Sequence, residues 1–194
     1  MAEYALLHTA TFLSSQVFKL PPESRKTLAI PQGEGVALDL SLSFHIGKLS
    51  AGAGSFGVAL RAPPSSTKGA GLVLTFDVGA ADAAGTRAVI CNTGSVVTSP
   101  LPKIRVLDGE TLDLRVLLDR PILEVVLQGG RVGFIHAQLG LNASSEAVHV
   151  FNEGKAQIDV VNVTAYGMGC GWTDTLPVPR HGDDASDEEI LSSF

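Results

Sequence analysis

The chain has 194 residues, which is enough for one well-packed domain with tails, whereas two complete domains would be cramped. Its formal net charge of −6 argues against nucleic acid and anionic membranes as partners, because both require clustered Lys and Arg. No apolar run approaches the roughly 20 residues that span a bilayer, so no membrane association is expected. The N-terminus lacks a basic region followed by an apolar one, so no signal peptide is expected, and the location stays open.

The N-terminal part of the chain gives a weak pattern. Residues 1–15 are predicted to be a linker or an irregular segment, and a first strand is expected around residues 16–20. Turns rich in Pro or Gly follow at residues 21–24 and 31–35. The folded domain is therefore expected to begin near residue 16.

Alternation of apolar and polar residues begins after the second turn and predicts half-buried antiparallel strands. The strongest run has an apolar residue at every second position: Val36, Leu38, Leu40, Leu42 and Phe44. Shorter runs predict strands at residues 56–60, 72–78 and 87–92. Residues 98–103 contain two prolines, so this segment is expected to be an extended connector rather than a central strand.

The sequence of residues 112–134 predicts three short strands joined by two tight turns. An Asp-Arg-Pro sequence at 119–121 breaks the first strand, and a Gln-Gly-Gly sequence at 128–130 supplies the positive-φ residues of a hairpin turn. Glu124 and Arg131 lie on the two strands that flank this turn. Their predicted role is a salt bridge across the hairpin, and the alternatives are a contact with another domain and a contact with sugar.

Two further strands are expected at residues 147–152 and 157–166. Roughly ten strand candidates without a long amphipathic helix predict an all-β fold, a two-sheet antiparallel β-sandwich of the jelly-roll or concanavalin-like kind with little helix. The sandwich should span residues 16–170, and residues 171–194 are predicted to be an acidic, flexible tail. Trp172 is expected to pack this tail onto the sandwich, with an exposed platform for sugar as the alternative.

Residues 114–126 read Leu-Arg-Val-Leu-Leu-Asp-Arg-Pro-Ile-Leu-Glu-Val-Val, and Gly-Gly-Arg follows at 129–131. This sequence resembles the C-terminal β-sandwich module of glycoside hydrolase family 32, the family of invertases, inulinases, levanases and fructan exohydrolases. Residues 55–61 and 148–168 resemble two other parts of that module in order and spacing. Three positions depart from the family pattern: Pro121, Val126 and Tyr166.

The resemblance implies a role without catalysis. The catalytic domain of the family is a five-bladed propeller that carries the motifs Trp-Met-Asn-Asp-Pro-Asn-Gly, Arg-Asp-Pro and Glu-Cys, and none of these occurs in this sequence. The chain is therefore expected to be the module that supports the propeller of an invertase-like β-fructofuranosidase by domain packing. A stand-alone carbohydrate-binding or oligomerisation module is the alternative.

Four residues are the candidates for structural or inter-domain contacts: Asp119, Arg120, Glu124 and Arg131. The implied partners are the propeller of the parent chain, a fructan or sucrose-type sugar, and a second copy in a homodimer. No catalytic residue is expected, because the catalytic motifs are missing and no pair of carboxylates has a reason to be held together. No metal or other cofactor is expected, because the histidines and cysteines show no metal-ligand spacing. Cys91 and Cys170 are expected to be free thiols, although two cysteines also permit one disulfide.

Overall fold

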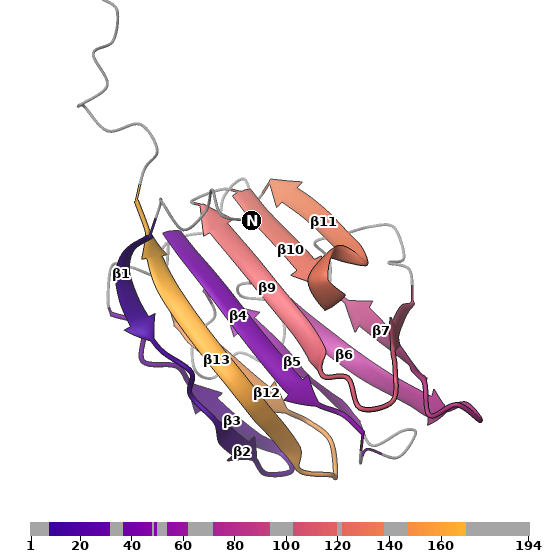
Figure 1. The fold of residues 1–194 in the computed structure, drawn as a ribbon. Helices are drawn as coiled ribbons and strands as arrows, with labels where there is room; N and C mark the ends of the chain where they lie inside the picture. Colours follow the sequence, from indigo (N-terminus) through magenta and orange to yellow (C-terminus); the bar gives the residue numbers. More distant parts are fainter. Residues whose placement is uncertain are drawn as a thin grey trace, which may run out of the picture.

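The computed structural model is a sandwich of two antiparallel β-sheets (Figure 1). It describes residues 8–31, 37–47, 49, 54–61, 72–93, 103–119, 122–137 and 147–169. The seven-stranded sheet contains β1 (His8–Leu13), β2 (Phe18–Leu20), β4 (Ala37–His45), β9 (Leu112–Asp119), β10 (Ile122–Leu127), β11 (Val132–Ala137) and β13 (Ile158–Met168). The six-stranded sheet contains β3 (Ser24–Thr27), β5 (Ser55–Leu60), β6 (Leu72–Ala81), β7 (Arg87–Asn92), β8 (Ile104–Val106) and β12 (Val148–Asn152). The predicted all-β sandwich is confirmed.

The strand order brings distant parts of the chain together. The seven-stranded sheet runs β1-β13-β4-β9-β10-β11, with β2 also pairing with β13, and the six-stranded sheet runs β3-β12-β5-β6-β7-β8. The late strand β13 therefore lies between the first strand and β4 (Figure 1). Because these pairings join residues more than a hundred positions apart, the seven-stranded sheet depends on long-range contacts.

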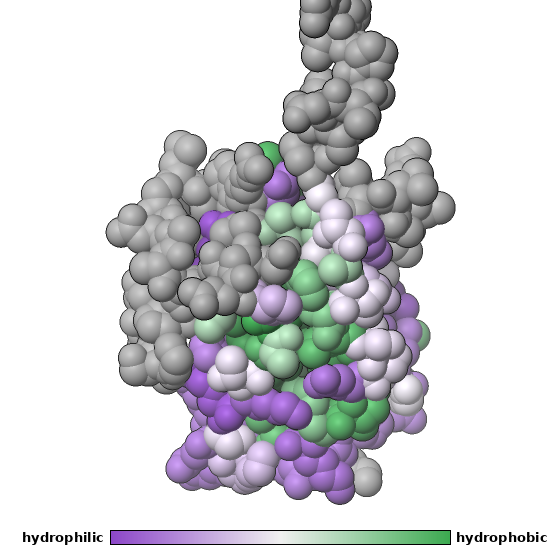
Figure 2. All heavy atoms as spheres, turned by 90° about the vertical axis from the view of Figure 1, so that its left-hand side faces the viewer, coloured by the Kyte–Doolittle hydropathy of each residue, from purple (hydrophilic) through white to green (hydrophobic). Residues whose placement is uncertain are grey.

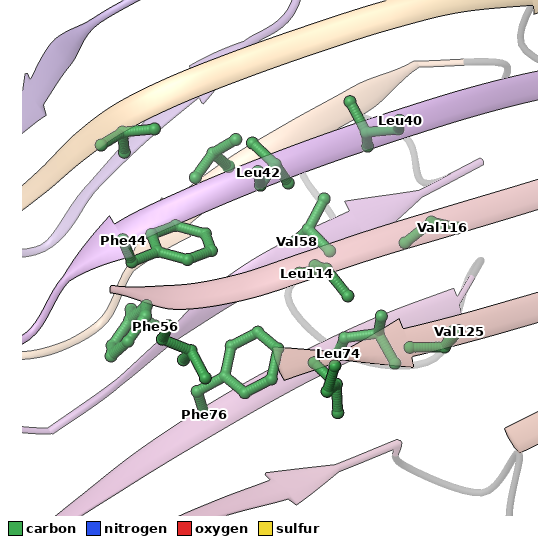
Figure 3. Packing of buried hydrophobic residues seen from close by; sticks show 14 of the residues in the cluster. Leu40, Leu42, Phe44, Phe56, Val58, Leu74, Phe76, Leu114, Val116 and Val125 are labelled. Atoms are coloured by element: carbon green, nitrogen blue, oxygen red, sulfur yellow. The ribbon is translucent and has the colours of Figure 1, made fainter. Parts of the chain in front are cut away.

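The core forms where the inward faces of the two sheets meet. The apolar residues of β4, whose alternation predicts the strand, point inward and are no more than 1% exposed: Leu38, Leu40, Leu42 and Phe44. The Phe44 ring centroid lies 5.1 Å from that of Phe56 and 6.2 Å from that of Phe76, which belong to the opposite sheet. Figure 3 shows these rings packed together between the sheets. Tilted ring pairs at such distances add to the burial of apolar surface.

The predicted meander of three strands is confirmed in β9, β10 and β11, which pair in register. The last turn is η2 (Gln128–Gly130), whose three residues all have positive φ, with values of 50° for Gln128, 62° for Gly129 and 101° for Gly130. The two glycines adopt these angles without the steric penalty of a Cβ, which explains the Gly-Gly sequence.

The N-terminal segment differs from the expectation of a linker or irregular structure over residues 1–15. Residues 8–13 form β1, which pairs with β13 along the edge of the seven-stranded sheet. Only Leu13 of this strand is buried, so the sequence carries no alternation that could reveal it. Two other short strands, β3 and β8, also lack a sequence signal. The tail at residues 171–194 lies outside the described residues.

One edge of the sandwich carries apolar side chains between the two sheets. Figure 2 turns the side with β1, β2 and β3 toward the viewer and shows apolar residues gathered between polar margins. Phe12 of β1, Phe18 of β2 and Ile30 are partly buried and pack against the core. These side chains close the gap between the sheets along this edge.

Candidate functional site

The outer face of the seven-stranded sheet, which points away from the six-stranded sheet, carries a cluster of polar side chains. In the register of this sheet, Asp39 of β4 lies beside Tyr166 of β13 and Leu117 of β9. Arg115 of β9 lies beside Ser41, two residues along β4 from Asp39. Asp39 is only 3% exposed although it points outward, so its neighbours cover it.

The carboxylate of Asp39 is held by two basic side chains. Arg115 donates from Nε to Oδ1 at 2.9 Å and from Nη2 to Oδ2 at 2.7 Å. His8 Nε2 lies 2.8 Å from Oδ2, and the His8 ring stacks on Tyr166 with centroids 4.2 Å apart. We call these four residues the Asp39 cluster. It joins β1, β13, β4 and β9 across the sheet, and a bidentate Arg–carboxylate pair fixes their relative geometry.

The environment of Asp39 suits a structural role rather than acid–base catalysis. Burial raises the pKa of its carboxyl group, but the hydrogen bonds from Arg115 and His8 outweigh that effect and hold the pKa below its ordinary value of 3.8. The group is therefore ionised at neutral pH and has no proton to give to a leaving group. Both of its oxygens are already engaged by Arg115, and one of them also by His8.

A second ion pair lies beside η2 at the other end of β9. Arg131 donates from Nη1 to Glu110 Oε2 at 2.9 Å and from Nη2 to Oε1 at 2.8 Å. The Leu107 backbone N–H donates to the same carboxylate at 2.9 Å, and Arg131 also donates to the Arg105 carbonyl at 3.1 Å. The hydrogen bonds from Arg131 and Leu107 lower the pKa of Glu110 to about 2, and Glu110 in turn raises the pKa of Arg131.

This pair corrects the predicted salt bridge between Glu124 and Arg131. Glu124 lies beside Leu117 and Ile135 in the middle of β10, whereas Arg131 lies in the turn before β11 begins. The two side chains therefore do not face each other, and Arg131 reaches Glu110, which comes before β9.

The other residues predicted to make structural or inter-domain contacts do not lie together with Arg131. Asp119 is the exposed last residue of β9, beside Ile122 and Ala37. Arg120, Trp172 and Cys170 lie outside the described residues. The structure therefore brings Asp119 and Glu124 to one outer face and places Arg131 in a different pair at the η2 end.

Two adjoining hollows open beside η2. One has a volume of about 370 Å³ and is lined by Gly109, Glu110, Thr111, Asp113, Gln128, Gly129 and Arg131. The other has a volume of about 250 Å³, contains Ser41, Ser43 and Arg115 in its lining, and shares Asp113 and Gly129 with the first. We call the two together the η2 cleft. Its lining offers carboxylates, guanidinium groups and hydroxyls, which suit hydrogen bonding more than bond cleavage.

Sequence reasoning missed three residues that organise this face, namely His8, Asp39 and Glu110. Asp39 gives a faint signal, because it is the only carboxylate in a long alternating strand. Its partner Arg115 is 76 positions away, so the pair could be found only once β4 and β9 are known to be neighbours. Glu110 and Arg131 are 21 positions apart and meet because the start of β9 and the end of β10 lie at the same end of this strand pair.

Metal binding and membrane spanning find no support in the described part of the chain. No group of three or more His, Cys, Asp or Glu side chains there is arranged to hold a metal ion. None of its helical segments is long and apolar enough to cross a membrane. Cys91 is a buried free thiol, and burial raises its pKa to about 12.

Comparison with known protein families shows to which family the chain belongs. The sequence matches the family described as "Glycosyl hydrolases family 32 C terminal" over residues 8–167. The chain belongs to this family. The resemblance expected from residues 114–131 is thereby confirmed, and the match begins with β1, the strand that the sequence pattern did not reveal.

Solved structures resemble this family 32 domain in fold. The fructan 1-exohydrolase IIa from Cichorium intybus superposes with a TM-score of 0.65 at 19% identity, over 86% of this chain and 37% of that enzyme. The β-fructofuranosidase from Aspergillus kawachii gives a TM-score of 0.61 at 16% identity, over 89% of this chain and 30% of the other. The domain thus spans about a third of the length of these enzymes. No curated protein matches the sequence.

Proposed function

We propose that this family 32 domain has no catalytic role of its own and packs against the catalytic propeller of an invertase-like β-fructofuranosidase, which it stabilises. The family match over residues 8–167 carries this proposal. Two further observations support it. The sequence lacks the three catalytic motifs expected for the propeller, and the domain spans only 37% of the length of the fructan 1-exohydrolase that it resembles.

The outer face of β9, β10 and β11 is the surface that we assign to this packing. Ile135 is 71% exposed and lies beside Glu124, and Ile122 is 49% exposed near the same end of these strands. On the outer face of the six-stranded sheet, Ala59 and Phe151 are already buried, and Ile90 of β7 is 42% exposed. Exposed isoleucines on a sheet face favour a protein contact, because the free face of an antiparallel sheet is usually polar.

The first test is the reading frame that encodes this domain. Read upstream of Met1, it should encode the Asp-Pro-Asn-Gly, Arg-Asp-Pro and Glu-Cys motifs of a propeller. A native gene in which an initiation codon stands directly at residue 1 and no such motifs precede it would contradict the proposal.

The second test places charge on the proposed surface of the full-length enzyme. In the double variant Ile122→Glu, Ile135→Glu, the sucrose-hydrolysing activity should be lost several-fold faster on heating. The reason is that two carboxylates would be buried at the domain contact. Val17→Glu is the matched control, since Val17 is also 71% exposed but lies outside β9, β10 and β11. Equal half-lives for the two variants would remove this face from consideration.

The runner-up is an independent module that binds fructan or forms a homodimer. The exposed isoleucines of β10 and β11 would suit a second copy as well as a propeller. Analytical ultracentrifugation of the 194-residue chain separates these functions. A monomer is expected when the natural partner is a propeller, whereas a stable dimer that Ile135→Glu dissociates would favour the homodimer.

A further inference from the structure

We propose that the acidic C-terminal segment of this chain, residues 183–194, docks on one corner of the sandwich. The corner lies where β2 and β3 approach the first half of β13 (Figure 1). We call it the β2 corner and define it by five residues: Val17, Lys19, Lys26, Lys155 and Val161. The contact uses neither Ile122 nor Ile135, so it is tested separately from the packing against a propeller.

The β2 corner exposes apolar side chains. Val17 is 71% exposed and Val161 is 38% exposed. Phe18 pairs with Val160 in the antiparallel register of β2 and β13, so the same register brings Val17 beside Val161. This side of the sandwich faces the viewer in Figure 2, where apolar residues lie between polar margins. Adjoining apolar side chains with polar margins favour a contact with another segment of protein.

Lysines surround these valines. Lys19 is exposed on β2, Lys26 lies on β3 with its ammonium group 3.8 Å from the centroid of the Phe18 ring, and Lys155 is exposed in the turn before β13. They are three of the four lysines in the described ranges, and none of the three forms an ion pair with an acidic residue of those ranges. An acidic segment could therefore pair with them without displacing an internal partner.

The charge around the β2 corner also favours an acidic occupant. Arg25 adds a fourth basic side chain there, and three acidic residues are nearby, namely Glu23, Glu153 and Asp159. The rest of the described residues contain six basic and eight acidic side chains. The β2 corner is thus a place with an excess of positive charge on a surface that is otherwise slightly negative.

Residues 183–194 lie outside the described ranges, and their sequence has the complementary pattern. Five of these twelve residues are acidic and none is basic. Glu189 is followed directly by Ile190 and Leu191, and Phe194 comes three positions later. Carboxylates can thus reach the lysines while the apolar side chains cover the two valines. Because exposed ion pairs are weak on their own, the apolar part of the contact is needed.

The chain between β13 and this segment has a suitable length. Met168 pairs with His8 at the other end of the sheet edge, seven positions along β13 from Val161, which is about 23 Å at the rise of a strand. Ile190 follows Met168 by 22 positions. A coil of that length has a root-mean-square span of about 26 Å. A tether whose span matches the distance gives a high effective concentration of the segment at the β2 corner.

The test follows backbone amides of the full 194-residue chain by NMR. The variant Ile190→Ser, Leu191→Ser leaves every residue of the sandwich unchanged, so it preserves the fold. The amides of Val17, Lys19 and Val161 are expected to shift in this variant, although they are distant from it in the sequence. Added salt should move the same amides of the unaltered chain in the same direction, because exposed ion pairs are screened.

Charge reversal tests the lysines. In Lys19→Glu, Lys26→Glu, the ¹H–¹⁵N heteronuclear NOE values of Glu189 and Ser192 should fall to those of the Ile190→Ser, Leu191→Ser variant, because the segment is released. Adding Asp187→Lys and Glu188→Lys to the same chain should restore them, since the attraction returns with the signs exchanged. Lys103→Glu is the matched control and should leave them unchanged, because Lys103 is exposed before β8 at the opposite edge of the six-stranded sheet.

Three results would overturn the proposal. The first is that the amides of Val17, Lys19 and Val161 do not shift in the Ile190→Ser, Leu191→Ser variant, or that only other residues of the sandwich shift. The second is that Lys19→Glu, Lys26→Glu and Lys103→Glu give equal NOE values. The third is that the shifts grow with protein concentration, which would mean that the segment binds a second copy.

Discussion

Asp39 is a charged residue in the middle of a strand, and its surroundings explain how the sheet tolerates it. Arg115 and His8 satisfy its oxygens, and Tyr166 stacks on His8 over the cluster. Tyr166 stands where the family pattern has Trp, so the departure seen in the sequence coincides with an aromatic ring that serves this cluster. A buried charge with partners is tolerated, whereas the same charge without partners is costly.

Replacing Asp39 with Asn should lower the free energy of unfolding at pH 7 by about 3 kcal/mol, because the change removes the carboxylate charge from the buried pair with Arg115. The folded-state pKa of Asp39 is depressed, so its contribution is complete above the ordinary value of 3.8 and is lost as pH falls through the lower folded-state value. Urea unfolding should therefore show a large difference between the two proteins at pH 7 and a smaller one in strong acid. Asp77→Asn, an exposed change on the other sheet, should have little effect at either pH.

Glu110 should titrate near pH 2 in a ¹³C NMR experiment that follows side-chain carboxyl groups. The cause is the paired hydrogen bonds from Arg131 together with the Leu107 N–H, which all favour the ionised form. In Arg131→Gln the midpoint should move back toward the ordinary value of 4.5. A midpoint that does not change in this variant would mean that Arg131 does not hold the carboxylate in solution.

The close approach of β5 and β6 depends on Gly57. A Cβ built at this position would lie 1.8 Å from the Leu74 carbonyl oxygen, so any larger side chain must push the two strands apart. Gly57→Ala should destabilise the domain by about 2 kcal/mol or more, in the range found for overpacked sites. Gly133→Ala is the control, since its Cβ would come no closer than 3.4 Å to the Val125 carbonyl. Thermal unfolding measures both changes, and equal melting temperatures would contradict the steric argument.

Strands that bury one face could be predicted from the sequence, because burial of one face places an apolar residue at every second position. This holds for β4, β6, β9 and β10, whose inward residues are almost all apolar. Edge strands escape the same analysis. In β1 and β3 few residues are buried, so hydrogen bonds to a neighbouring strand, rather than side-chain burial, create the element.

The polar contacts were harder to predict than the strands. Because both residues flank one hairpin, the sequence predicts Glu124 as the partner of Arg131, but the structure places Glu110 within reach instead. A hairpin determines which residues face each other only where its two strands are hydrogen-bonded. Arg131 lies just outside the hydrogen-bonded residues of β10 and β11. The Asp39 cluster draws on four strands, so it follows from the sheet order and not from any local pattern.

The two sheets leave the domain with distinct surfaces. The outer face of β9–β11 carries the exposed Ile122 and Ile135, the η2 end carries the polar cleft, and the edge seen in Figure 2 carries side chains that seal the core. These surfaces lie at different places in the strand register.

The position of β13 between β1 and β4 bears on how the protein folds during synthesis. Translation delivers β1, β2 and β4 early, yet each of them must hydrogen-bond to a strand that begins only at Ile158. While the ribosome is still working, those early segments expose unpaired backbone groups and are open to wrong partners. Assembly of this sheet is thus expected to wait until β13 has been synthesised, and a chaperone that shields β1, β2 and β4 until then should raise the yield of folded protein.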